Sequence, residues 1–329
     1  MPSTPTPDTS DFAPIAGFWR RVAAFFVDGV ILALIGHGLG LMLFDVFVRL
    51  GPWGRGIGLL VALVYFVPQE SARAGQSLGK RLLRIRVVDA QGRSLSLGLG
   101  AARFAVFGVP YFLNGAALPM DLMMFAGGVP FALLVVGGLF ALAYLLAFNR
   151  RTRQSLHDLA VGSFVVRAGA RHAPAPACVW RGHLVIAGAL ALLAGASPLF
   201  YPWLTSIPPF AALSALDERL AAQPELRSVG VSASSGRVYG VHSDSHPIHE
   251  LRIDATIAKP PVDDVALSTR LAGIALASWP DAKLQDRIAV RLAYGFDIGI
   301  ASSWDANTLS LAPDQWADRV AAGVGSAAN

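Results

Sequence analysis

The sequence has little of the chemistry on which catalytic and metal-binding sites depend. Its 329 residues include a single cysteine, Cys178, which excludes an internal disulfide and a cysteine-based zinc site. It contains no G-x-S-x-G or H-E-x-x-H motif and no pair of acids on a common helical face. We therefore predict no catalytic residue, no cofactor and no metal, and an enzyme is the least favoured class.

Charged residues are also scarce. They make up 15% of the chain and hydrophobic residues 54%, against about 25% and 45 to 50% in ordinary soluble domains. Residues 1–204 hold 17 Lys+Arg and 8 Asp+Glu, whereas residues 205–329 hold 10 and 14. The basic residues stand in short segments between apolar runs. This pattern is typical of positive-inside membrane topology and not of nucleic-acid binding.

Long apolar runs predict an all-α polytopic membrane domain. Five runs qualify as transmembrane helices, and they cover residues 22–44, 54–67, 104–118, 125–148 and 183–204. The basic segments 71–103 and 149–181 should face the cytoplasm, as should the N-terminus. Residues 1–14 lack the features of a signal peptide, and their Pro, Ser and Thr content predicts a disordered tail. Five crossings of the membrane then leave the C-terminus outside.

Residues 208–329 have the composition of a small soluble α+β domain, which we expect outside the cytoplasm. Helical spacing covers residues 210–222, 262–279 and 313–320, and alternation predicts strands at 229–235, 251–257, 287–294 and 296–303. We expect a sheet of about four strands with helices on one face. The expected organisation is a tail (1–14), a membrane domain (15–168), a cytoplasmic linker (169–182), a fifth transmembrane helix (183–204) and the soluble domain (208–329).

Asp28 is a carboxylate inside the first apolar run. Arg21 precedes it by seven residues, so both lie on one helical face with a rise of about 10 Å between them. A charge at membrane depth costs about 2.5 to 3.5 kcal/mol, so such groups nearly always find a partner in the bundle or in a wet cavity. The rest of the chain should therefore supply polar partners for Asp28.

Two further polar clusters follow. The first is the loop motif Gly75, Gln76, Gly79 and Lys80, which continues to Asp89 and is followed by Arg103. It is one residue short of the P-loop spacing and no strand precedes it, so nucleotide binding is disfavoured. Apolar residues among its bases predict an amphipathic piece over residues 78–87 that rests on the headgroups. The second cluster runs from Arg153 through His157 and Asp158 to Val166.

The three clusters together resemble the RDD family of bacterial membrane proteins over residues 17–166. Arg21 and Asp28 stand where the family has its arginine and first aspartate, and Asp158 where it has the second. Ser77 and Ser163 replace usual threonines. The resemblance implies transport of an unidentified small ligand, or cation–proton exchange. Residues 205–329 lie outside it.

The expected ligand, ion or proton site comprises Asp28, Arg21, Asp158, His157, Arg103 and Arg153. We expect the two aspartates to converge at the cytoplasmic end of the bundle, with Arg21 and either Arg103 or Arg153 between them. Too few cations for two carboxylates would raise one pKa, as proton coupling requires. A structural lock would instead keep each acid paired and ionised. Both interpretations stay open.

Two functions are therefore open, a transporter and a non-catalytic membrane anchor that presents a periplasmic sensing or protein-interaction domain. Expected partners are the lipid bilayer, an unidentified small ligand or ion, and a periplasmic protein; nucleic acid is not expected, and an oligomer stays open.

A histidine cluster near residue 245 has the residue types of a metal site. It comprises His242, His246 and His249 with Asp244 and Glu250, in a Ser/Pro-rich segment without a helical i, i+4 pair. A solvated loop is the favoured interpretation.

Overall fold

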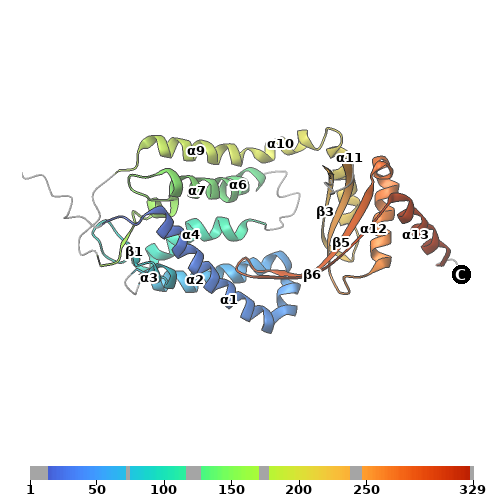
Figure 1. Cartoon of the computed structure of the whole chain (residues 1–329). Helices are drawn as coiled ribbons and strands as arrows, with labels where there is room; N and C mark the ends of the chain where they lie inside the picture. Colours follow the sequence, from blue (N-terminus) through green and yellow to red (C-terminus); the bar gives the residue numbers. More distant parts are fainter. Residues whose placement is uncertain (1–13, 72–74, 116–126, 170–177, 238–246, 327–329) are drawn as a thin grey trace, which may run out of the picture. The chain divides into compact units, whose positions relative to one another are not determined.

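The computed structural model describes residues 14–71, 75–115, 127–169, 178–237 and 247–326. The chain forms two compact units (Figure 1). The first contains residues 1–200 together with Asp297–Ser302, and the second contains residues 201–296 and 303–329. Most of the expected tail, most of the linker, and His242, Asp244 and His246 lie outside the described residues.

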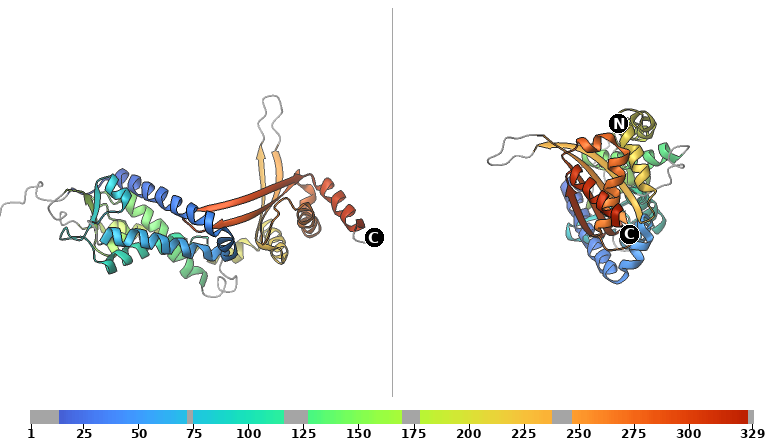
Figure 2. Two further views of the ribbon diagram at one scale, coloured as in Figure 1. Left: turned by 90° about the horizontal axis from the view of Figure 1, so that it is seen from below. Right: turned by 90° about the vertical axis from the view of Figure 1, so that its right-hand side faces the viewer.

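The first unit is mainly helical. Its elements are α1 (Phe18–Leu50), η2 (Gly51–Trp53), α2 (Gly54–Ser71), α3 (Leu78–Leu82), α4 (Leu97–Leu113), α6 (Gly128–Ala132), η4 (Leu133–Gly137), α7 (Gly138–Phe148), α8 (Leu156–Ala160) and α9 (Arg181–Gly195). The boundary between the units lies within helix α10 (Ser197–Leu204). Helix α2 folds back alongside α1 (Figure 2).

Three of the described helical stretches are long and apolar enough to cross a membrane. They are Phe18–Ser71, which contains both α1 and α2, Gly128–Phe148 and Arg181–Leu204. Large apolar side chains of α1 are exposed, such as Leu34 and Leu41, as expected of a surface that faces acyl chains. The chain is therefore a membrane protein with apolar helices, while five crossings stay a prediction.

Helix α4 differs from the third predicted span. It covers Leu97–Leu113, seven residues earlier than expected, because Ser96 caps its N-terminus by accepting a hydrogen bond from the Leu99 N–H (3.3 Å). Arg103 therefore lies inside a helix and not before one. At 17 residues α4 is also shorter than the three stretches above.

The amphipathic piece expected at residues 78–87 differs from the structure in its second half, whereas Leu78 and Leu82 are exposed and their contact with headgroups stays a prediction. Only Leu78–Leu82 is helical, and β1 (Ile85–Val88) follows as a strand that pairs antiparallel with β2 (Phe164–Arg167). Ile85 and Val87 are completely buried against Ala16, Ala24 and Val165. Residues 162–166 have the composition of a strand, in agreement with β2, and β1 packs the apolar residues Ile85 and Val87 into the protein and not against lipid.

The second unit is a four-stranded sheet with helices. Its elements are α11 (Phe210–Ala221), β3 (Leu226–Arg237), β4 (Pro247–Ile257), α12 (Val265–Ser278), η5 (Pro280–Leu284), β5 (Arg287–Asp297), β6 (Ser302–Leu311) and α13 (Pro313–Ser326). The strand order is β3-β4-β5-β6. The β3–β4 pair is antiparallel, and β4 and β5 are parallel with α12 in the crossover. The expected four-stranded sheet is confirmed.

One face of this sheet carries the core. Every second residue of β4 from Leu251 to Ile257 is buried, together with the matching residues of β5, against Leu216 and Leu220 of α11, Leu271 of α12 and Trp316 of α13. The expected break at Gly295 is wrong, since this residue lies inside β5. A side chain there would collide with the Ser303 backbone oxygen, so the glycine permits a close approach of β6.

Candidate ligand site

Six charged side chains gather where α1 begins. They are Arg21 of α1, Asp28 of α1, Glu70 of α2, Lys80 of α3, Arg103 of α4 and Asp158 of α8. None of these side chains is more than 13% exposed. Three are cations and three are anions, so the cluster, which we call the ion-pair network, is neutral when all six are ionised.

Asp158 is the centre of the network. Its Oδ2 atom lies 2.5 Å from Arg21 Nη2, and its Oδ1 atom accepts hydrogen bonds from Arg103 Nη2 (2.7 Å) and Nε (3.0 Å). Ser155 begins α8 with a capping box, in which its N–H donates to Asp158 Oδ2 (3.1 Å). Burial acts to raise the pKa of Asp158, but the two guanidinium groups outweigh it and hold that pKa well below its usual range. Asp158 is therefore ionised at neutral pH.

Asp28 has different partners from those expected. It accepts hydrogen bonds from Tyr65 Oη (2.7 Å), Ser77 Oγ (2.6 Å) and the Gly79 N–H (2.7 Å), and Lys80 Nζ lies 3.9 Å away. Arg21 turns instead to Asp158 and to the backbone oxygen of Arg153. The expected placement of Arg21 between the two aspartates thus differs from the structure, because α3 occupies that position beside Asp28.

The residues of the loop motif hold α3 against Asp28. A side chain at Gly79 would collide with the Ala24 backbone oxygen and with Asp28 itself, so only glycine lets the two backbones approach. Gly75 has a φ of +69° and accepts a hydrogen bond from Val87 N–H (2.7 Å), and Gln76 donates to the Ile85 oxygen (2.9 Å). The motif residues therefore position donors for a carboxylate and hold β1 in place.

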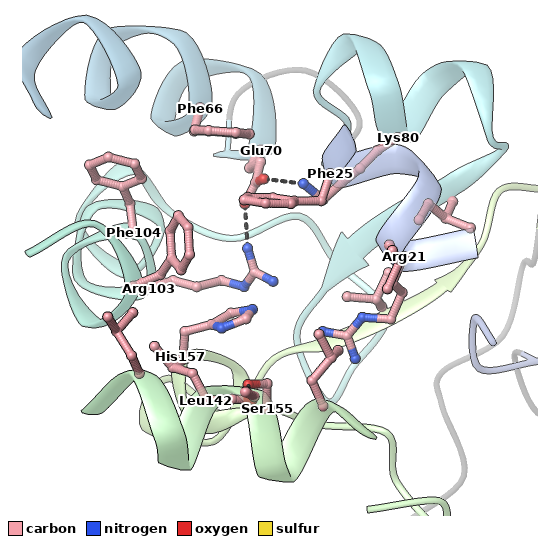
Figure 3. A pocket seen from close by; sticks show the side chains of 17 residues that line it. Arg21, Phe25, Phe66, Glu70, Lys80, Arg103, Phe104, Leu142, Ser155 and His157 are labelled. Carbon is pink, nitrogen blue, oxygen red and sulfur yellow. Dashed lines mark hydrogen bonds and ion pairs between the residues drawn. The ribbon is translucent and has the colours of Figure 1, made fainter. Parts of the chain in front are cut away.

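Glu70 is a member of the network that sequence reasoning missed. Its Oε1 atom lies 2.5 Å from Lys80 Nζ and its Oε2 atom 2.5 Å from Arg103 Nη1 (Figure 3). Glu70 thereby links the Asp28 side of the network to the Asp158 side. The signal that could have found it is an acid three residues after the second apolar run, directly before a basic segment.

His157 lies next to Asp158, with its Nε2 atom 3.4 Å from Asp158 Oδ1. Burial lowers the pKa of His157 to about 3, and the nearby Arg103 and Arg21 charges add to this against the opposing effect of Asp158. The imidazole is therefore neutral at pH 7. Arg153 adopts a φ of +52° and contributes its backbone oxygen to Arg21.

A cavity of about 310 Å³ opens against the network (Figure 3). Its walls are largely apolar, and the lining comprises Val22, Phe25, Phe66, Ile85, Phe104, Phe107, Leu139, Leu142, Ala143, Leu146 and Val165, with Arg21, Glu70, Lys80, Arg103, Ser155 and His157 as polar members. Asp28 and Asp158 are not among the described residues that line it. Three cationic side chains and one carboxylate of the network therefore line the cavity.

Within the described part of the chain, no group of three His, Cys, Asp or Glu residues is arranged to hold a metal ion. Of the histidine cluster singled out in the sequence, His249 and Glu250 lie on β4. The His249 N–H donates to Asp286 (2.7 Å).

Apolar helices around a buried ion-pair network define an integral membrane domain. Residues 15–162 match the model of the RDD family, which confirms the resemblance for this part of the chain. Two Bacillus subtilis (strain 168) proteins that carry the names Uncharacterized protein YxaI and Uncharacterized protein YckC are similar to it. YxaI is 25% identical over 134 residues, which cover 34% of this chain and 86% of YxaI. YckC is 27% identical over 153 residues, which cover 46% of this chain and 85% of YckC. No solved structure matches.

Proposed function

We propose that the RDD domain binds a small amphiphilic anion in the cavity beside the ion-pair network and carries it through the bilayer. The observation that carries this proposal is the unequal distribution of charge. Arg21, Lys80 and Arg103 line the cavity, whereas two of the three carboxylates that neutralise them lie behind the lining. The cavity wall is thus locally positive although the network is neutral.

The chemistry of the walls defines the rest of the ligand. Apolar side chains from α1, α2, α4 and α7 surround the charged patch. In such a medium a charge pair interacts far more strongly than in water, so the cations should select the sign of the ligand head. Small-molecule sites commonly combine mainly apolar walls with a few placed polar groups, in volumes of about 300 to 1,000 Å³. An anionic head with an apolar portion fits this description.

The proposed function also requires a membrane in which the protein lies and an orientation of the protein in it. We propose that the protein lies in the bacterial inner membrane and that the ion-pair network is on the cytoplasmic side. Exposed arginines near the network end support this, among them Arg20, Arg81, Arg84, Arg150 and Arg151. No catalytic step is assigned to any residue.

Binding is tested with two permanently charged probes, octanesulfonate and octyltrimethylammonium, added to the full-length protein in nanodiscs of zwitterionic lipid. Saturable binding of the sulfonate by calorimetry, at least tenfold tighter than that of the cation, is expected. Ala143→Phe, which fills the cavity from α7, should weaken sulfonate binding at least tenfold. Ala147→Phe lies one turn further along the same helix, outside the lining, and should bind as the native protein does. Equal binding of both probes would contradict the proposal.

A second candidate function is the membrane anchor. It is favoured by the neutral network, in which the pKa of Asp158 is held low as in a permanent lock, and by the separate core of the second unit. Flux separates the two functions. Proteoliposomes that bind octanesulfonate and exchange it across the bilayer support a carrier, whereas binding without exchange supports an anchor with a ligand-sensing membrane domain.

A further inference from the structure

A second cavity of about 90 Å³ adjoins the first. It is lined by Phe25, Gly29, Leu32, Ala62, Phe66, Phe104, Phe107, Tyr111, Phe112, Gly299 and Ile300. Four phenylalanines, at positions 25, 66, 104 and 107, line both cavities. None of the described residues that line the second cavity is charged. The two cavities are thus neighbouring chambers with a shared aromatic wall, one beside cations and one apolar.

One wall of the second cavity includes Gly299 and Ile300 of the segment Asp297–Ser302, which is part of the first unit and which we call the end wall. Arg55 of α2 holds this loop through Asp297 Oδ2, at 2.6 Å from Nη2 and 3.1 Å from Nε. Tyr111 Oη donates a hydrogen bond to the Gly299 oxygen (3.2 Å). An ion pair from α2 and a hydrogen bond from α4 therefore fix the wall.

Glycines let the loop lie deep between the helices. A side chain at Gly58 of α2 would collide with the Ile298 backbone oxygen, and a Cβ at Gly36 of α1 would lie 2.8 Å from the Ala301 Cβ. Gly299 itself adopts a φ of +80°, which favours glycine. The wall is therefore built into the helical unit by close backbone contacts.

We infer that the second cavity binds the apolar chain of the anionic ligand, so that the substrate class is a single-chain alkyl anion, and that Ile300 limits the chain length. The inference rests on the proposed function, because it needs the head to lie beside the cations of the first cavity. The two volumes together lie at the low end of the range for small-molecule sites, which favours one chain over a two-chained lipid. The alkyl chain of a ligand whose head lies beside the cations would extend past the four phenylalanines into the uncharged second cavity.

Alkyl sulfonates of increasing length test the inference on the full-length protein in zwitterionic nanodiscs. Burial of each methylene should tighten binding about fourfold until the chain reaches the end wall, after which affinity should level off. Gly29→Leu fills the second chamber, and the space around the Gly29 Cβ position is open, so the change can be accommodated. Gly38→Leu is the matched control, since Gly38 is also in α1 with open space but is not among the described lining residues.

In Gly29→Leu the longest probes should lose at least tenfold in affinity while the shortest bind as in the native protein, which also shows that the variant folds. Gly38→Leu should retain the full length dependence. Ile300→Ala should move the plateau to longer chains. If short sulfonates bind but Gly29→Leu and Ile300→Ala leave the length dependence unchanged, the second cavity is not the chain site, although the proposed function stands. If no sulfonate of any length binds the native protein, the proposed function itself fails, and this inference with it.

Discussion

Asp28 and Asp158 are both completely buried carboxylates, but their partners differ in charge. Asp158 lies between two guanidinium groups, whereas Asp28 accepts hydrogen bonds from a phenol, a hydroxyl and a backbone N–H. Proton coupling at these carboxylates would require a shortage of cations around the two aspartates. The structure adds Glu70 and Lys80 and makes the charges equal. For Asp158 the low pKa favours the structural lock.

The two aspartates should therefore respond differently to the same change. Asp158→Asn leaves Arg21 buried without its carboxylate, and we expect a loss of about 3 to 5 kcal/mol in the free energy of unfolding. Asp28→Asn removes the charge that lies 3.9 Å from Lys80, but Lys80 keeps Glu70 as its partner and the other three donors are neutral, so the change should cost about 1 to 3 kcal/mol. Thermal unfolding in detergent micelles measures both. Arg93→Gln, which removes the 74% exposed partner of Asp89, is the control, expected within about 1 kcal/mol of the native protein. A larger loss for Asp28→Asn than for Asp158→Asn would contradict this assignment of partners.

At the scale of elements, the five-residue helix α3 matters more than its length suggests. It has one backbone N–H aimed at Asp28 and one lysine aimed at Glu70, and Ser77 caps it while also donating to Asp28. A single short helix thereby joins α1 to α2. The same residues were singled out in the sequence as a loop motif, and their physical role is close backbone approach.

Gly79→Ala tests that role. The added methyl group meets the Ala24 backbone oxygen, which cannot turn aside as a side chain can, so we expect a loss of about 1 to 3 kcal/mol in stability. Gly98→Ala in the first turn of α4 is the matched control, because its Cβ position is open and alanine is the better helix former by about 0.5 to 1 kcal/mol. The melting temperatures of the two variants in detergent should move in opposite directions. Similar shifts in both melting temperatures would show that the position of α3 does not depend on the close approach of Gly79 to the Ala24 backbone.

For the whole molecule, the number of crossings decides on which side the second unit lies. The stretch Phe18–Ser71 folds back on itself and supplies two helices, and Gly128–Phe148 and Arg181–Leu204 supply two more. If α4 also crosses, the total is five and the C-terminus lies outside. If α4 stays on one side, the total is four and the C-terminus lies inside.

We expect five crossings with the N-terminus in the cytoplasm. Alkaline phosphatase fused after Asn329 should be active in cells, and a fluorescent protein at the same position should be dark. A reporter after Arg167, in the segment that follows the fourth predicted crossing, is the internal control and should behave in the opposite way. A C-terminal reporter that is active only in the cytoplasm would show that α4 does not cross.

Local pattern was enough to determine much of this protein. Composition and apolar runs predicted a membrane domain, three motifs in order predicted the RDD family over most of residues 15–162, and alternation predicted the four-stranded sheet. Each of these features is visible along a single segment, because burial in lipid or against a sheet imposes a period on neighbouring residues. Where the pattern failed, as at Ile85 and Val87, the apolar residues belong to a strand whose partner is far away in the chain.

Only the tertiary structure decided which charges pair and where the chambers lie. Arg21 and Asp158 are separated by 137 residues, and Arg55 and Asp297 by 242. Glu70 stands before a basic segment, but its pairing with Lys80 and Arg103 is not visible along the chain. Spacing along one helix predicts which residues share its face, but a buried ion pair needs two elements whose packing excludes water from both charges. That packing depends on glycines such as Gly79 and Gly58, whose effect on neighbouring backbones appears only once the chain is folded.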